Sequence, residues 1–228
     1  MGTAFEKAIG LIAAGDETLL DIISVTLKMS LSSSILALLI GVPFGVFLGS
    51  SHFRGKKVIV VINRTLMGLP PVVCGLLCFL MFCGVGPLRH LKLLYTVKGM
   101  VIAQIMLITP IVVGAMEPFV DGIYPMIRDT SEGLGLSKGR ITKLLINESR
   151  YQIVSTYLLA LSRALAEVGA VSMVGGAIIF KTNVMTTAIM NYTNMGNFQM
   201  AMALGIILMG ISLVINIVVS LIQRGSEI

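Results

Sequence analysis

Residues 117–150 read EPFVDGIYPMIRDTSEGLGLSKGRITKLLINESR, a strongly charged segment set between apolar stretches that are long enough to cross a membrane. Acidic and basic side chains nearly balance within it. After Pro125, one helical face collects a largely apolar stripe, made of Met126, Ile127, Thr130 and Leu134. We predict that a short amphipathic helix forms in this charged segment.

A second helix is predicted after a glycine in the same segment. Gly135 supplies a left-handed end for the first helix, because glycine adopts positive φ without steric cost. Ser137 can then cap the next helix, whose apolar stripe comprises Ile141, Leu144 and Leu145. Two amphipathic helices hinged at a glycine and placed between membrane spans are typical of a docking element.

The charged segment resembles the cytoplasmic loop of bacterial ABC-importer permeases. That family's pattern is roughly E-A-A, three residues, Gly, nine residues and then I-x-L-P. Here Asp129, Thr130 and Ser131 occupy the first three positions, whereas residues 145–148 replace the proline-ended part. The resemblance implies an ATPase-coupling loop formed by Asp129, Thr130, Ser131, Glu132, Gly133, Leu134 and Gly135. An ordinary solvated linker between helices is the alternative for this loop taken alone.

The composition indicates an integral membrane protein. Of the 228 residues, 56% are hydrophobic and only 12% are charged, whereas a soluble domain has about 25% charged residues. The formal charge of +6 does not indicate nucleic-acid binding, because the basic residues flank apolar spans instead of gathering on one face. The chain contains no Gly-x-x-x-x-Gly-Lys-Ser/Thr motif, so nucleotide binding by that route is not expected.

Five stretches are long enough to cross a bilayer, which takes about 20 mostly apolar residues. They are approximately residues 19–48, 58–83, 97–116, 153–180 and 200–222. Pro70 and Pro71 interrupt the second stretch, so we expect a short interfacial helix before Leu69 and a crossing from Pro71 onward. Without an internal repeat, the prediction is a single all-α membrane domain, residues 1–228, with residues 117–150 as its cytoplasmic ATPase-coupling loop.

The distribution of basic residues predicts the orientation. With five spans, nine Lys and Arg residues lie on the side of the charged segment and five lie on the other. Positive residues favour the cytoplasm, so we expect the charged segment and the C-terminus inside and the N-terminus outside. Arg89, Lys92 and Lys98 would then face outward, where they either attract an anion or contact lipid headgroups.

Charged residues inside the predicted spans are candidates for function. Arg163 and Glu167 lie one helical turn apart near the middle of the fourth span, where each charge costs about 2.5–3.5 kcal/mol to insert. The pair is either part of a pore or gate, with Arg163 near an oxyanion path, or a structural ion pair. Lys28 in the first span either attracts an anion or extends to the outer surface. Gly169 begins a run of small residues that lets helices approach closely or leaves room for a solute.

No metal site is predicted. Cys74, Cys78 and Cys83 lie in one apolar stretch, where they have neither histidine nor acidic partners. We therefore expect these cysteines to pack in the membrane interior.

Several longer stretches extend the resemblance to nearly the whole chain. They are GLPPVVCGLLCFL (68–80), YTVKGMVIAQIMLITPIVVGA (95–115), SRALAEVGAVSMVGG (162–176) and NVMTTAIMNYTNMGNFQMAMALG (183–205). They are similar to the sulfate, molybdate and tungstate branch of type I ABC-importer permeases, and most of all to tungstate permeases. The features that weigh most are Pro70 with Pro71, Gln104 with Pro110, the segment from Arg163 to Gly169, and Thr186 with Thr187.

The resemblance implies a type I ABC importer permease fold and a homodimer in the bacterial or archaeal cell membrane. Two separate ATPase subunits, which hold ATP and Mg²⁺, would dock on the cytoplasmic face, and an extracytoplasmic oxyanion-binding protein would deliver the solute. This chain would need no cofactor and would not be an enzyme. Its cargo would be a tetrahedral oxyanion, most of all tungstate, with molybdate or sulfate as alternatives, moved by alternating access. A secondary transporter driven by an ion gradient is the rival class, disfavoured because no inverted repeat is evident.

Overall fold

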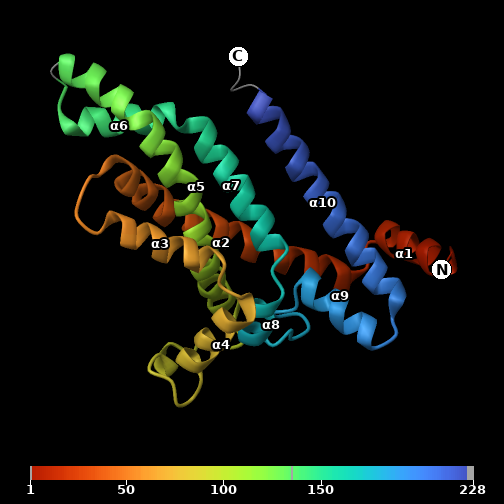
Figure 1. The fold of residues 1–228 in the computed structure, drawn as a ribbon. Helices are drawn as coiled ribbons and strands as arrows, with labels where there is room; N and C mark the ends of the chain where they lie inside the picture. Colours follow the sequence, from red (N-terminus) through yellow and green to blue (C-terminus); the bar gives the residue numbers. More distant parts are fainter. Residues whose placement is uncertain (1, 135, 225–228) are drawn as a thin grey trace.

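The computed structural model describes residues 2–134 and 136–224, apart from the side chains of residues 2–5, 7, 132, 138, 219 and 222–224. Every regular element in this described part is a helix (Figure 1). In order they are α1 (Gly2–Ala14), α2 (Glu17–Ser50), α3 (Lys56–Met67), α4 (Pro71–Phe82), the 3-10 helix η1 (Arg89–Leu91), α5 (Val97–Gly133), α6 (Lys138–Glu148), α7 (Arg150–Leu165), α8 (Gly169–Gly175), α9 (Met185–Asn194) and α10 (Phe198–Arg224).

Helices α2 and α5 form the central pair of the molecule. Small residues recur every four positions on α2, at Ser33, Ala37, Gly41, Gly45 and Gly49. The three glycines of this series pack directly on α5, because a Cβ added to Gly41, Gly45 or Gly49 would lie only 2.6–2.7 Å from side-chain atoms of Val112, Met116 or Val120, respectively. Both series ascend along the chain, so α2 and α5 run parallel, and their C-terminal ends lie on the same side of the molecule.

Long apolar helices agree with the predicted number of membrane spans. By length and composition, α2, α10 and α5 as far as Ser131 can each cross a membrane. The pairs α3–α4 and α7–α8 qualify as two further spans if each bent pair is counted once, with bends of 97° and 59°. The prediction of an all-α membrane protein with about five spans is confirmed.

The helix break at Pro70 and Pro71 is confirmed, but the prediction of a crossing from Pro71 onward is wrong. Pro70 is the N-cap of α4 and Pro71 is its first residue. An N–H at that position has no hydrogen-bond partner within the helix, so its absence in proline costs nothing there. The 12 residues of α4 extend about 18 Å, against a hydrocarbon core of about 30 Å. Helix α4 alone is therefore too short to cross, and α3 and α4 qualify as a candidate span only when the bent pair is counted together.

The expected break between the third span and the charged segment is absent. Helix α5 continues through Pro110, Pro118 and Pro125 to Gly133, so the first amphipathic helix of the charged segment is the far end of α5. Each proline removes one backbone hydrogen bond, and α2 packs closely along α5 past Pro110 and Pro118, as far as Val120. The charged segment therefore begins on a continuous extension of a membrane helix.

The fourth predicted span, residues 153–180, is not continuous. Helix α7 ends at Leu165, and α8 starts at Gly169 after a bend of 59°. Helices α1 and α9 were not predicted at all; α9 begins where the Thr187 hydroxyl accepts a hydrogen bond from the Val184 N–H (3.2 Å).

Two of the three cysteines, Cys74 and Cys78, pack in the interior as predicted, whereas Cys83 is partly exposed. Cys74 and Cys78 are fully buried in an apolar cluster that joins α4, α5 and α8. Within the described residues, no group of three or more His, Cys, Asp or Glu side chains is arranged to hold a metal ion.

Candidate functional site

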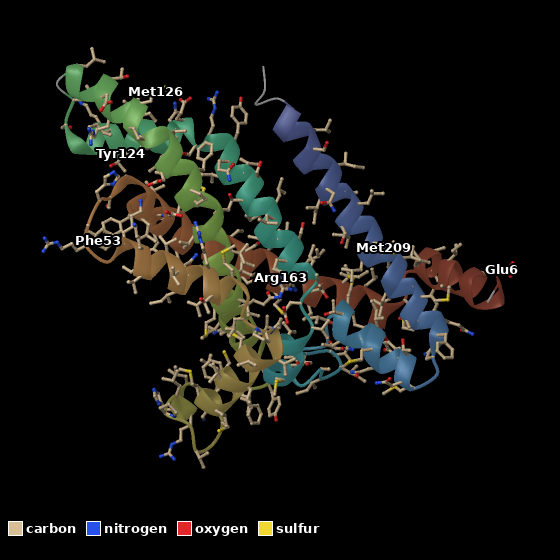
Figure 2. The ribbon with its side chains drawn as sticks, in the orientation of Figure 1. Glu6, Phe53, Tyr124, Met126, Arg163 and Met209 are labelled. Atoms are coloured by element: carbon tan, nitrogen blue, oxygen red, sulfur yellow. The ribbon has the colours of Figure 1, made fainter. Side chains whose placement is uncertain are left out.

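The bend between α7 and α8 holds the charged pair that the sequence singled out. Arg163 lies in the last turn of α7, and its Nη1 is 3.2 Å from Oε2 of Glu167. Glu167 lies beyond the end of α7, so the two residues do not share a helix as expected. Its side chain is 3% exposed, whereas that of Arg163 is 36% exposed. Figure 2 labels Arg163 at the end of α7 nearest α8.

Glu167 joins three elements at this bend. Its Oε1 accepts a hydrogen bond from the Ala170 N–H at the start of α8 (3.1 Å), and its backbone C=O accepts one from the Thr186 hydroxyl on α9 (2.8 Å). A buried carboxylate is tolerated only when it is paired and hydrogen-bonded. Glu167 therefore fixes the direction of α8 and holds the guanidinium of Arg163 at the surface of the bend.

The two helix bends pack against each other. Gly169 lies against Pro71 and Val72, where an added Cβ would be 2.9 Å from Val72 Cγ2. An added Cβ on Gly75 would lie 2.7 Å from the Cα of Ala170. The structure thus brings together the predicted helix break and the predicted small residue, two features that are about 100 positions apart in the sequence.

Gln104 ties this bend to the central helix pair. Its amide donates a hydrogen bond to the C=O of Ala164 in the last turn of α7 (2.8 Å), a carbonyl that also accepts a long backbone hydrogen bond from the Glu167 N–H (3.4 Å). Its Oε1 accepts a hydrogen bond from the Ser33 hydroxyl on α2 (2.6 Å). Because Gln104 is fully buried, this three-helix network depends on each of its members.

A groove with hydroxyl and amide groups set in a largely apolar lining runs along α7 and was not predicted. It has a volume of about 280 Å³ and lies between α5, α7 and α10. Its polar lining comprises Gln152, Ser155, Thr156, Ser162 and Asn216. A helical spacing of polar residues from 152 to 162 was visible in the sequence and could have revealed this stripe.

Lys28 does not belong to this group. It is exposed on α2, and within the described part of the chain no ion pair or side-chain hydrogen bond connects it with the α7–α8 bend. Its proposed attraction of an anion gains no geometric support.

The charged segment presents apolar side chains at its tip. Met126 and Leu134 are 67% and 71% exposed, and Met126 is labelled near the far end of α5 in Figure 2. Asp129 is exposed beside Arg128 (3.3 Å), whereas Ser131 is buried. Gly133 is the last residue of α5. The expected left-handed end at Gly135 lies outside the described residues, as does the side chain of Glu132.

Helix α6 anchors the charged segment to the membrane domain. Ser137 occupies the N-cap position as predicted, although its side chain makes no capping hydrogen bond. Ile141 and Leu145 are buried in a cluster with Val46 of α2 and Met116 of α5, while Leu144 is exposed. A displacement of α6 would therefore be transmitted to the α2–α5 pair.

An ion-pair cluster links α3 to α5 near the charged segment. Lys56 Nζ lies 2.6 Å from Asp121 Oδ1 and 4.0 Å from Glu117 Oε1. It joins the start of the bent span α3–α4 to the part of α5 that leads into the charged segment.

Sequence comparisons identify relatives over nearly the whole chain. The family model described as binding-protein-dependent transport system inner membrane component matches residues 41–227. A tungstate uptake system permease protein TupB of Peptoclostridium acidaminophilum is 34% identical over 220 residues, covering 96% of both chains. A probable anion ABC transporter permease protein of Haloferax volcanii is 35% identical over 214 residues, covering 90% of this chain and 92% of the other. A TupB protein of Campylobacter jejuni is 33% identical over 220 residues, covering 96% and 92%.

Proposed function

We infer the cargo and the mechanism from a fixed premise: this chain belongs to the family of binding-protein-dependent transport system inner membrane components, and it is the permease subunit of an ABC-type anion transporter. Its type I ABC permease fold supplies the membrane part of such a transporter. We propose that the anion is tungstate. The support is the similarity, over nearly the full length, to two permeases named for tungstate uptake.

The observation that carries the proposed path is the position of Arg163. Its guanidinium is partly exposed at a bend between membrane helices, next in sequence to Ser162, which lines the polar groove. A doubly charged oxyanion cannot enter the hydrocarbon core without its hydration shell, because the free-energy cost of dehydration is too high. The groove offers hydroxyl and amide groups in place of water, and Arg163, whose charge is partly offset by the ion pair with Glu167, adds a moderate positive field without creating a tight site.

We further propose that transport depends on partners that hydrolyse ATP. Two copies of this chain would enclose the path, two ATPase subunits would grip the charged segment from the cytoplasm, and a binding protein outside would deliver the anion. Met126 and Leu134, exposed at the tip of the segment, supply apolar contacts for the ATPase. ATP binding and hydrolysis on that partner would move the segment, and with it α5 and the two bends, between outward-facing and inward-facing arrangements.

The same proposal assigns the orientation. Because α2 and α5 run parallel, the basic loop after α2 (Arg54, Lys56 and Lys57) lies on the same side as the charged segment. In Figure 1, the α6 end of α5 and the C-terminal end of α10 both lie toward the top of the view. Positive charge on this side supports a cytoplasmic location for it and for the C-terminus, with the N-terminus outside.

Transport in reconstituted vesicles tests this function. The permease is reconstituted with the ATPase and the binding protein that co-purify with it, and uptake of tungstate, molybdate and sulfate is compared with and without ATP. We expect ATP-dependent uptake in which tungstate outcompetes the other two anions. Preference for molybdate or sulfate would refute the assigned cargo. Uptake by the permease alone, driven by an ion gradient, would refute the ATP-driven mechanism.

A further inference from the structure

A cavity of about 770 Å³ lies where α2 ends and α3 begins, on the side of the molecule that carries the charged segment. Both apolar and cationic side chains line it, among them Phe53, Arg54, Lys57, Val60, Val61 and Arg64. Phe53 is labelled beside this loop in Figure 2. The cavity is far larger than the polar groove on α7, and neither the anion path nor the ATPase contact uses it.

The cavity keeps positive charge that the protein does not neutralise. Its acidic groups, Glu117 and Asp121, are both engaged by Lys56, at 4.0 and 2.6 Å. Arg54, Lys57 and Arg64 are exposed, and the structure gives them no ion pair or side-chain hydrogen bond within residues 2–134 and 136–224. These three cations leave the lining of the cavity with an excess of positive charge.

The position and the lining decide which anion fits. The loop joins two membrane spans, so the cavity lies at a bilayer surface, where lipid phosphates are found. Phe53, Val60 and Val61 form an apolar wall, which a free inorganic anion would leave unused. A second copy of this chain is disfavoured, because a twofold contact would bring the same unpaired cations together.

We propose that this cavity binds an anionic phospholipid, with its phosphate between Arg54, Lys57 and Arg64 and an acyl chain along α3. Guanidinium and ammonium groups make charge-assisted hydrogen bonds to phosphate oxygens, and anionic lipids attract juxtamembrane basic residues. The lipid would lie beside the Lys56–Asp121 contact, about three turns before the end of α5. It would therefore stabilise α3 against the helix that leads into the charged segment. This proposal depends on the membrane location of the chain and not on the identity of its cargo.

Lipid titration monitored by native mass spectrometry tests the site. The full-length protein is delipidated in detergent and titrated with phosphatidylglycerol or with phosphatidylcholine of the same acyl chains. The test variant combines Arg54→Gln, Lys57→Gln and Arg64→Gln. The matched control combines Arg89→Gln, Lys92→Gln and Lys98→Gln, which remove the same charge at the opposite end of α5.

We expect the wild type to prefer phosphatidylglycerol. Each removed cation should weaken that binding about fivefold, so the test variant should lose roughly a hundredfold, while the control stays within about twofold. Equal losses in the two variants would overturn the proposal, because they would indicate general attraction to headgroups. Displacement of the lipid by an equal concentration of inorganic phosphate would overturn it in favour of a free anion. A change in the subunit stoichiometry of the test variant would overturn it in favour of a contact between copies.

Discussion

Removing the charge of Arg163 alone should destabilise the protein more than removing both charges of the Arg163–Glu167 pair. Glu167 is 3% exposed, so Arg163→Gln leaves a buried carboxylate unpaired, which costs about 3–5 kcal/mol for a buried pair. Glu167→Gln costs less, on the order of 1–2 kcal/mol, because Arg163 is one-third exposed and glutamine still accepts the Ala170 N–H bond. The double variant retains that bond and buries no charge, so we expect it to lie near Glu167→Gln.

The buried cysteines provide the assay. Cys74 and Cys78 are fully buried and become reactive only on unfolding, so a thiol-reactive fluorophore reports the midpoint of thermal denaturation. Cys83, which is partly exposed, is first replaced by serine. At about 2–4 °C per kcal/mol for a chain of this size, Arg163→Gln should lower the midpoint by roughly 6–20 °C and the double variant by roughly 2–8 °C.

Two outcomes would refute this reasoning, one for each of its parts. If the effects of the single changes simply add in the double variant, the two side chains are not energetically coupled.

Transport tests the role of Arg163 in the anion path. A double variant that folds should still lose about tenfold or more in tungstate uptake, and Arg163→Lys should keep most of the uptake. Normal uptake by the folded double variant would exclude Arg163 from the anion path.

Two further changes test the charged segment and the central helix pair. Leu134→Asp places a charge on an exposed apolar contact, so it should abolish co-purification of the ATPase without lowering thermal stability. The control Leu91→Asp on η1 changes an equally apolar, half-exposed residue and should leave co-purification intact. Co-purification retained by Leu134→Asp would remove Leu134 from the contact. Gly45→Ala places a methyl group 2.7 Å from Met116 Cβ and should cost about 1–3 kcal/mol by thermal denaturation. Gly122→Ala in α5 meets no atom within 4 Å and should be neutral or stabilising by about 0.5–1 kcal/mol; equal destabilisation by the two changes would show that helix packing is not the cause.

Local chemistry made part of this fold predictable. Pro70 and Pro71 cannot lie inside a regular helix, so the break between α3 and α4 follows from two adjacent residues. The pairing of Arg163 with Glu167 was likewise expected from the cost of unpaired charge in a membrane, although the two residues meet across the end of α7 and not along one helix. Both inferences depend only on residues close together in the chain.

Contacts between residues far apart in the chain determine the features of the fold that were not predicted. No proline marks the end of α7 at Leu165. At that helix end, the side-chain amide of Gln104, 60 positions away, donates a hydrogen bond to the Ala164 carbonyl, and the Thr186 hydroxyl donates one to the Glu167 carbonyl. The sequence also placed a separate short helix after Pro125, whereas α5 continues through Pro110, Pro118 and Pro125 and packs against α2 as far as Val120. Tertiary contacts decided both cases, and no local pattern encodes them.

The same packing restricts where the molecule can move. Gly41, Gly45 and Gly49 fit against side chains of α5 at one register, and a slip of α5 along α2 would drive Cβ groups of Val112, Met116 and Val120 out of their glycine contacts. Force applied at α6 must therefore move α2 and α5 as one body. The bends α3–α4 and α7–α8 are the interrupted parts of the bundle, and they meet at Gly75 and Gly169. A change between inward-facing and outward-facing arrangements would accordingly be concentrated at these bends, where Arg163 lies.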